Sequence, residues 1–433
     1  MEMRRLLINQ LLEWKKRKSG KPLIVRGARQ VGKTWLMREF GRRHYEKHVY
    51  LNFEDNPQLE RLFSLGLDSA KLVEGLSAYS GVSIDERTLM IFDEVQAVPK
   101  ALTSLKYFNE NAPGYQIVAA GSLLGIALHE GTSFPVGKVE FADLRPLSFS
   151  EFLRAVGYGR YADILESHDS ELIGALRPEL IDLLKKYMFV GGMPEAVACY
   201  AKTKDYAAVR EIQGAILAAY ENDFSKHAPY NIVPRIRLLW RSIPKQLAKE
   251  NRKFVYGLVK EGARAREYEI ALMWLVDCGL VHKVHRVSTG RHPLKAYEDQ
   301  AAFKLYMADS GLLCALSGIA ASALVDGDSL FSDYRGAVTE QFALQELVRQ
   351  GIFPFYWSSE KSSGEVDFVF QSGPKVIPLE VKAGENLQAK SLRFFAAKYE
   401  IEKSLRTSLS DFRQESWLLN LPLYMIGQIG HWA

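Results

Sequence analysis

The stretch of sequence that decides the fold is Gly27-Ala28-Arg29-Gln30-Val31-Gly32-Lys33-Thr34. Its two glycines and its Lys-Thr pair match the phosphate-binding loop G-x-x-x-x-G-K-[ST]. The apolar residues 22–25 before it suit a buried parallel strand, and residues 35–40 after it suit a helix. The motif requires this order of strand, loop and helix, so the sequence predicts a site for nucleotide phosphates.

Each part of the loop has an expected task. Gly27 and Gly32 allow a tight turn that brings backbone N–H groups to the phosphates, next to a helix N-terminus that favours anions. Lys33 is expected to reach the β- and γ-phosphates, and Thr34 to bind Mg²⁺. ATP and Mg²⁺ are therefore the predicted cofactors. The predicted nucleotide-binding residues are Gly27, Ala28, Arg29, Gln30, Val31, Gly32, Lys33, Thr34 and Trp35.

The composition limits the class of protein. A chain of 433 residues suggests about three domains, and 47% hydrophobic with 25% charged residues is typical of globular proteins. A net charge of +5 allows nucleic acid as a partner without requiring it. Cys199, Cys278 and Cys314 form no C-x-x-C pair, which favours a reduced, cytoplasmic protein without a zinc site. No apolar run of 18 residues is present, so no membrane span is expected.

The first half of the chain predicts a nucleotide-binding core followed by a helical lid. Residues 1–150 alternate helical patterns with four expected strands, at 22–26, 48–53, 89–92 and 116–120. Such alternation predicts a parallel sheet covered on both faces. Residues 151–225 look helical throughout and include expected helices at 171–188 and 206–220.

The second half predicts two further domains. Residues 226–325 read as three helices and two short strands, an order similar to a winged helix-turn-helix. From residue 326 to residue 433 the pattern becomes a separate α/β unit. Its expected elements are a helix at 336–350 and strands at 355–357, 366–370 and 376–381.

A second group of polar residues completes the predicted ATPase site. The apolar strand at 89–92 runs into Asp93, expected at the metal, and Glu94, expected to polarise the attacking water. Ser122 follows the next strand and is a candidate γ-phosphate sensor, with a simple strand-to-helix turn as the alternative. Arg145 is favoured over Lys138 as an arginine finger, although a surface arginine is the competing interpretation.

Together these segments resemble a bacterial and archaeal family of AAA-type ATPases. The matching segments are 25–34 (VRGARQVGKT), 91–96 (IFDEVQ), 144–152 (LRPLSFSEF), 191–195 (GGMPE) and 304–312 (KLYMADSGL). The last two resemble the C-terminal domain of unknown function that accompanies this ATPase. The resemblance implies an α/β protein with a P-loop AAA+ core, a helical lid, a winged helix and a restriction-endonuclease-like domain. Similar proteins often have arginine where Lys138 stands. The resemblance therefore does not decide which residue would serve as the arginine finger.

A set of carboxylates near the C-terminus is similar to the PD-(D/E)XK nuclease pattern. Asp367 lies in one expected strand, and Glu380 and Lys382 share a face of the next because strand side chains alternate. Glu340, on the helix before them, completes the set. The three carboxylates would bind Mg²⁺ and the lysine would orient or activate water. Alternatively, the Glu-x-Lys triplet is a solvated strand face, or the fold is an inactive DNA-binding or assembly module.

Two functions follow from these patterns. The first is an ATP-hydrolysing protein that acts on DNA with a Mg²⁺-dependent nuclease-like domain. The second is an ATP-driven switch or scaffold whose C-terminal domains bind DNA or protein without cleavage. The expected DNA contacts are in the C-terminal domain and in the basic residues of 264–295, for which a protein-docking winged helix is the alternative. The sequence does not decide whether the chain forms a homo-oligomer.

Overall fold

The chain folds as two compact units. The computed structural model describes residues 3–17, 20–121, 137–249, 251–325, 332–359, 364–385 and 388–433. The N-terminal unit consists of Arg5–Arg145 with Asp277–Gly279, and the C-terminal unit chiefly of Pro146–Val276 and Leu280–Ala433. None of the helices in the described ranges combines the length and the apolar character needed to cross a membrane.

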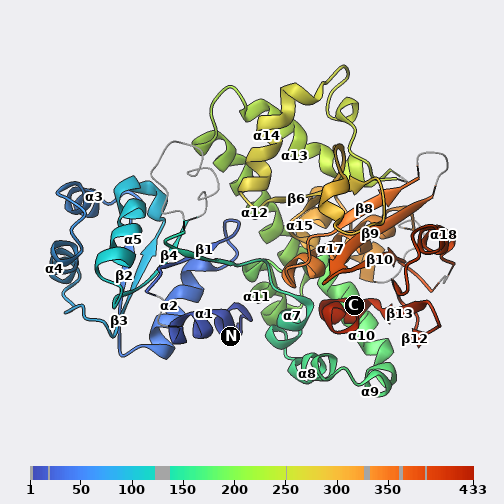
Figure 1. The fold of residues 1–433 in the computed structure, drawn as a ribbon, viewed down its shortest axis with the longest axis horizontal. Coiled ribbons are helices and arrows are strands. Elements are labelled where there is room, and N and C mark those ends of the chain that lie inside the picture. The colour runs from blue at the N-terminus through green and yellow to red at the C-terminus, as the bar shows by residue number, and fades with distance from the viewer. Residues whose placement is uncertain are drawn as a thin grey trace. The chain divides into compact units, whose positions relative to one another are not determined.

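The N-terminal unit is built on a sheet of five strands, all paired in parallel (Figure 1). Its strands are β1 (Leu23–Arg26), β2 (Lys47–Asn52), β3 (Thr88–Asp93), β4 (Gln116–Ala120) and β5 (Glu140–Asp143). Their order in the sheet is β2-β3-β4-β1-β5, so β4 lies between β1 and β3. The predicted parallel-sheet core is therefore confirmed.

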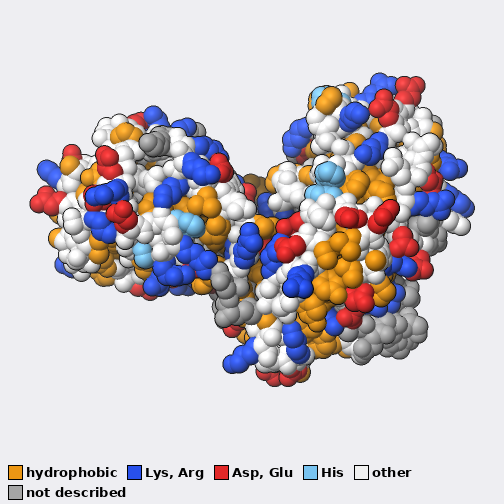
Figure 2. Space-filling view, turned by 90° about the horizontal axis from the view of Figure 1, so that it is seen from below, with side chains coloured by type: hydrophobic (Ala, Val, Ile, Leu, Met, Phe, Trp, Pro, Cys, Tyr) orange, Lys and Arg blue, Asp and Glu red, His pale blue; other side chains and the backbone are white. Residues whose placement is uncertain are grey.

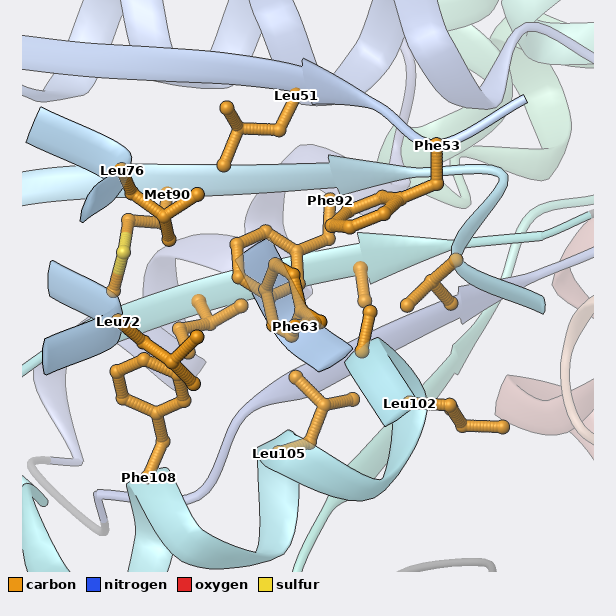
Figure 3. Packing of buried hydrophobic residues seen from close by; sticks show 14 of the residues in the cluster. Leu51, Phe53, Phe63, Leu72, Leu76, Met90, Phe92, Leu102, Leu105 and Phe108 are labelled. Atoms are coloured by element: carbon orange, nitrogen blue, oxygen red, sulfur yellow. The ribbon is translucent and has the colours of Figure 1, made fainter. Parts of the chain in front are cut away.

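Helices cover this sheet. They are α1 (Leu7–Lys16), α2 (Lys33–His44), α3 (Pro57–Ser64), α4 (Ser69–Ser80), the short η1 (Val95–Ala97) and α5 (Pro99–Asn111). Buried residues of α3, α4 and α5 form one apolar cluster with the strands, in which Phe53, Phe63 and Phe92 meet edge to face (Figure 3). Burying each such ring stabilises the fold by roughly 1.5–3 kcal/mol. α2 packs against β2, β3 and β4 with Leu36, Met37 and Phe40 buried outside that cluster.

The C-terminal unit combines many helices with one large sheet (Figure 1). Its first helices are α7 (Phe149–Ala155), α8 (Gly159–Ser167), α9 (Ser170–Ala175), α10 (Arg177–Val190), α11 (Pro194–Thr203), α12 (Tyr206–His227), α13 (Val233–Leu247), η2 (Tyr256–Leu258) and α14 (Ala265–Asp277). The later ones are η3 (Leu294–Tyr297), α15 (Ser310–Leu316), α16 (Ala321–Val325), α17 (Ser332–Arg349), α18 (Lys390–Tyr399), η5 (Leu423–Gln428) and α19 (Ile429–Trp432). The expected helix at 171–188 is two helices, because Pro178 starts α10 and cannot continue α9.

The sheet of this unit has eight strands among the described residues, in the order β12-β13-β11-β10-β9-β8-β6-β7. The strands are β6 (Val281–Val287), β7 (Glu298–Met307), β8 (Phe355–Ser358), β9 (Glu365–Ser372), β10 (Lys375–Val381), β11 (Ser404–Ser408), β12 (Arg413–Gln414) and β13 (Leu418–Pro422). β6 and β7 form the hairpin expected of a winged helix, but β6 also pairs in parallel with β8. The boundary predicted at 325/326 therefore does not separate two sheets, since the edge of β6 is paired instead of exposed.

Two of the sequence motifs meet in the core of the C-terminal unit. The buried carboxylate of Asp309 accepts a hydrogen bond from the backbone N–H of Gly192 at 2.6 Å and from that of Leu312 at 3.0 Å, which caps α15. A Cβ on Gly192 would lie 2.2 Å from the carbonyl oxygen of Leu147, so only glycine fits there. The hydrogen bonds of Asp309 and the close packing of Gly192 thus explain why these two residues stand in the segments 191–195 and 304–312.

Candidate functional site

The topology brings the predicted ATPase residues to one edge of the N-terminal sheet. The loop of residues 27–34 connects β1 to α2, and Asp93 ends β3. Because β4 lies between these two parallel strands, the loop and Asp93 are at the same, carboxyl edge of the sheet. Ligands of open α/β sheets bind at this edge.

Glycine is required at two places in the loop. Gly27 has a φ of 147°, and a Cβ there would lie 2.1 Å from the carbonyl oxygen of Leu144. Gly32 has a φ of 93° and precedes the first residue of α2. Both conformations are unfavourable for any residue with a Cβ atom, so the glycine spacing of the motif follows from the path of the backbone.

Lys33 is held inside the loop. Its Nζ donates hydrogen bonds to the carbonyl oxygens of Gly27 at 2.8 Å and Ala28 at 2.9 Å. Burial lowers the pKa of Lys33 to about 8, against the opposing effect of Glu94 and Asp93. The side chain is buried and remains mostly protonated at neutral pH, which suits a group that binds phosphate.

Thr34 and Asp93 form the predicted metal-binding pair. Thr34 Oγ1 donates to Asp93 Oδ2 at 2.5 Å, and Tyr50 donates to the same oxygen at 2.9 Å. Asp93 Oδ1 accepts from the backbone N–H of Glu94 at 3.1 Å. The hydroxyl of Thr34, in the first turn of α2, and the carboxylate of Asp93, at the end of β3, are hard oxygen ligands that fit Mg²⁺. Tyr50, which aligns with Ile91 on the neighbouring strand β3, was not among the predicted site residues.

Glu94 lies at a sharp turn after β3. Its φ of 50° is in the left-handed region, which few non-glycine residues adopt and which recurs at functional sites. Its Oε2 accepts a hydrogen bond from Gln96 Nε2 at 2.7 Å. The carboxylate is therefore oriented by a side chain two residues further along the same turn.

Arg5 is a site residue that was not among those predicted from the sequence. Its buried guanidinium donates to the carbonyl oxygens of Val31, at 2.8 Å, and Arg145, at 2.5 Å. It thereby fastens the phosphate-binding loop to the segment after β5. The sequence carries no signal for this contact, because the residues are distant along the chain.

The remaining predicted residues are placed as follows. Ala28 and Val31 are buried, while Arg29 is half-buried and Gln30 and Trp35 are exposed. The guanidinium of Arg145 lies 3.8 Å from the carboxylate of Asp143, and Lys138 pairs with Glu110 at 2.9 Å. Both finger candidates therefore have an acidic neighbour within their own unit. Ser122 lies outside the described residues.

The depressed pKa of Lys33 predicts how nucleotide affinity depends on pH. A bound polyphosphate raises this pKa, so binding above about pH 8 requires uptake of a proton. We expect the dissociation constant for ATP to increase by up to about tenfold per pH unit above that value. Lys33→Arg keeps its charge, so titrations of a fluorescent ATP analogue should show no such slope for this variant. Equal slopes in both proteins would contradict the assignment.

The predicted carboxylates lie on adjoining elements of the C-terminal unit. Glu340 lies on α17, Asp367 on β9 and Glu380 on β10, and β9 and β10 pair antiparallel. Burial and the neighbouring carboxylates of Glu340 and Glu380 raise the pKa of Asp367 well above its ordinary value. Asp367 Oδ2 accepts from the backbone N–H of Val381 at 2.7 Å, and Lys382 Nζ lies 2.7 Å from Glu380 Oε1.

Buried cations, however, already neutralise Glu340. Arg252 pairs with its Oε2, while its Oε1 accepts from Tyr306 and, at 2.9 Å, from Lys304. Although burial raises the pKa of Glu340, Arg252 and Lys304 together hold it below its ordinary value. In the described part of the chain no group of three or more His, Cys, Asp or Glu residues could hold a metal ion. In this arrangement the cluster does not fit Mg²⁺, because Glu340 is fully engaged, and its predicted metal role stays a prediction.

The basic residues of 264–295 are partly neutralised as well. On the β6–β7 hairpin, Arg286 pairs with Asp299 at 2.9 Å and Lys295 with Glu298 at 2.6 Å. Arg264 and Arg266, at the start of α14, are exposed. Basic and acidic side chains are intermixed over much of the face shown in Figure 2. The predicted DNA contacts of this segment therefore stay a prediction.

Three family models match separate segments of the chain. Residues 19–153 match the family model of an AAA domain. Residues 181–323 match a domain of unknown function (DUF8612), and residues 335–424 match another (DUF4143). No curated protein sequence matches the chain.

Several solved structures are distantly similar. The Walker-type ATPase PABY2304 of Pyrococcus abyssi is 14% identical with a TM-score of 0.46, covering 73% of this chain and 96% of its own. The ORC2 protein of Aeropyrum pernix, in its ADPNP-ADP complexes, is 15% identical with a TM-score of 0.37, covering 76% and 95%. The chain is thus similar to AAA-type ATPases over residues 19–153 and continues into two domains of unknown function.

Proposed function

We propose that the chain binds and hydrolyses ATP in its N-terminal unit. The observation that carries this proposal is the hydrogen bond from Thr34 to Asp93, which joins the phosphate-binding loop to the end of β3. Lys33 and Glu94 lie beside this pair. A cation, two metal-binding oxygens and a carboxylate for water are the parts that phosphoryl transfer to water needs.

Different residues of the site bind the phosphates, hold the metal ion and activate the water. Backbone N–H groups of the loop and the Lys33 ammonium bind the phosphates and stabilise the charge that spreads over their oxygens. Mg²⁺, held by Thr34 and Asp93, would neutralise part of the phosphate charge when bound. Glu94, turned by its left-handed backbone and oriented by Gln96, accepts a proton from the attacking water.

Lys33→Ala tests this proposal. Loss of the cation that faces the phosphates should reduce ATP turnover by about 100- to 1,000-fold. Phosphate release measured with saturating ATP and Mg²⁺ checks the result. Lys100→Ala is the matched control, because Lys100 is an exposed lysine on α5 that should leave turnover unchanged. Unaltered turnover in the Lys33 variant would exclude the loop as the site of hydrolysis.

For the C-terminal unit we propose action on DNA by the cluster of Glu340, Asp367, Glu380 and Lys382. The observation that favours cleavage is that β9 and β10, which carry Asp367 and Glu380, pair directly, while α17, which carries Glu340, packs against β10. The observation that favours the alternative, a switch or scaffold that binds DNA or protein without cleavage, is the neutralisation of Glu340 by Arg252 and Lys304.

A cleavage assay distinguishes the two functions. The full chain is incubated with plasmid or single-stranded DNA, ATP and either Mg²⁺ or Mn²⁺. Nicked or linear product that disappears in Asp367→Asn would support cleavage. Intact DNA under all conditions, with a shifted band in a binding gel, would support the scaffold.

A further inference from the structure

We propose that Arg252 is an internal counter-cation that closes the carboxylate cluster of the C-terminal unit to divalent metal ions. The inference rests on the nuclease-type cluster proposed above and names how that site is regulated. Arg252 occupies Glu340 Oε2, an oxygen that the cluster would need for a metal ion. Displacing this one side chain would free that oxygen for a metal ion.

The other two carboxylates of the cluster, Asp367 and Glu380, offer oxygen ligands for a cation. Glu380 is 8% exposed, and its Oε2 is buried with no hydrogen-bond partner among the described residues. A buried carboxylate oxygen without a partner is costly, so a cation or a water molecule would stabilise it. Asp367 and Glu380 lie on the paired strands β9 and β10, and Glu340 lies on α17, which packs against β10. The cluster thus includes a buried carboxylate oxygen that lacks a partner among the described residues.

Of the two cations that pair with Glu340, Arg252 is the one whose side chain can be displaced. It lies between α13 and η2, in a segment without regular structure, and has a φ of 47°, which is unfavourable for a non-glycine residue. Its side chain is 17% exposed, so it enters the cluster from the surface. Lys304, by contrast, is fully buried in β7 and also pairs with Glu365 at 2.6 Å. Lys304 therefore joins α17 to the sheet, whereas Arg252 is the more exposed of the two cations.

Gly336 makes room for the guanidinium. A Cβ at this position of α17 would lie 2.7 Å from Arg252 Nη2, closer than the two atoms can approach. Gly336→Ala would push aside the end of a flexible side chain, while alanine is otherwise favourable within a helix. This substitution should therefore displace Arg252 and leave all charges of the cluster in place.

Binding of Mn²⁺ to the full chain without nucleotide tests the proposal, with electron paramagnetic resonance detecting the bound ion. Arg252→Gln and Gly336→Ala should each bind one Mn²⁺ about 10- to 100-fold more tightly than the unmodified chain, the range over which groups around a metal site change its affinity. Adding Asp367→Asn to Arg252→Gln should remove the gain. Arg252→Lys, which keeps the positive charge, should behave like the unmodified chain.

A matched control excludes a general effect of losing an arginine. Arg286→Gln breaks an ion pair with Asp299 elsewhere in the same sheet and should not change Mn²⁺ affinity. Equal Mn²⁺ affinity in the unmodified chain and in both displacing variants would overturn the inference, whatever the cleavage assay shows. If the displacing variants gain Mn²⁺ but no variant cleaves DNA, the block by Arg252 stands and the nuclease proposal falls.

Discussion

Glu94→Gln should reduce ATP turnover by about 100- to 10,000-fold and leave nucleotide binding in place. Glutamine has the shape of glutamate but cannot accept a proton from water at neutral pH. The loop, Lys33 and the Thr34–Asp93 hydrogen bond do not depend on the Glu94 side chain. Turnover is measured by phosphate release, and binding by titration of a fluorescent ATP analogue.

The control for this variant is Glu60→Gln, which changes an exposed glutamate on α3 of the same unit. It should leave both turnover and binding as they are. Loss of ATP binding in Glu94→Gln would assign the side chain to positioning of the nucleotide. Unchanged turnover would show that another group activates the water.

Glu340→Ala should destabilise the C-terminal unit by about 3–5 kcal/mol. The substitution leaves the cations of Arg252 and Lys304 and the hydroxyl of Tyr306 without their shared acceptor in the interior. Such uncompensated charges cost far more than the pair itself contributes. Urea unfolding followed by tryptophan fluorescence measures the change in the transition of this unit.

The comparison variant for Glu340→Ala is Glu402→Ala. Glu402 also pairs with a lysine, at 3.6 Å, but its side chain is 83% exposed. Exposed pairs contribute little, so the urea midpoint should not move measurably. A similar midpoint for the two variants would mean that Glu340 does not balance buried charge.

Much of the N-terminal unit could be predicted from the sequence, because its signals are local. The loop motif, the apolar strands and the Asp93-Glu94 pair each lie within a few residues, and the observed strands β1 to β4 match the expected ones closely. β5 was missed, since it is only four residues long and has an acidic residue at each end. Arg5 and Tyr50 were missed because their roles arise from contacts between distant segments.

The C-terminal unit was harder to predict for the same physical reason. The pattern identified the strands that carry Asp367 and Glu380, but not β11 and β13, which complete the sheet. Nor could it show that β6 pairs with β8, because strand pairing leaves no local trace. The neutralisation of Glu340 depends on Arg252 and Lys304, which lie 88 and 36 residues away along the chain.

Phosphate release from ATP by the full chain, measured with Mg²⁺ and again after EDTA, is the most direct test of the central claim. The arrangement of Lys33, Thr34, Asp93 and Glu94 predicts steady release that requires Mg²⁺ and stops when the metal is removed. Absence of release with Mg²⁺, or release that continues unchanged after EDTA, would contradict it.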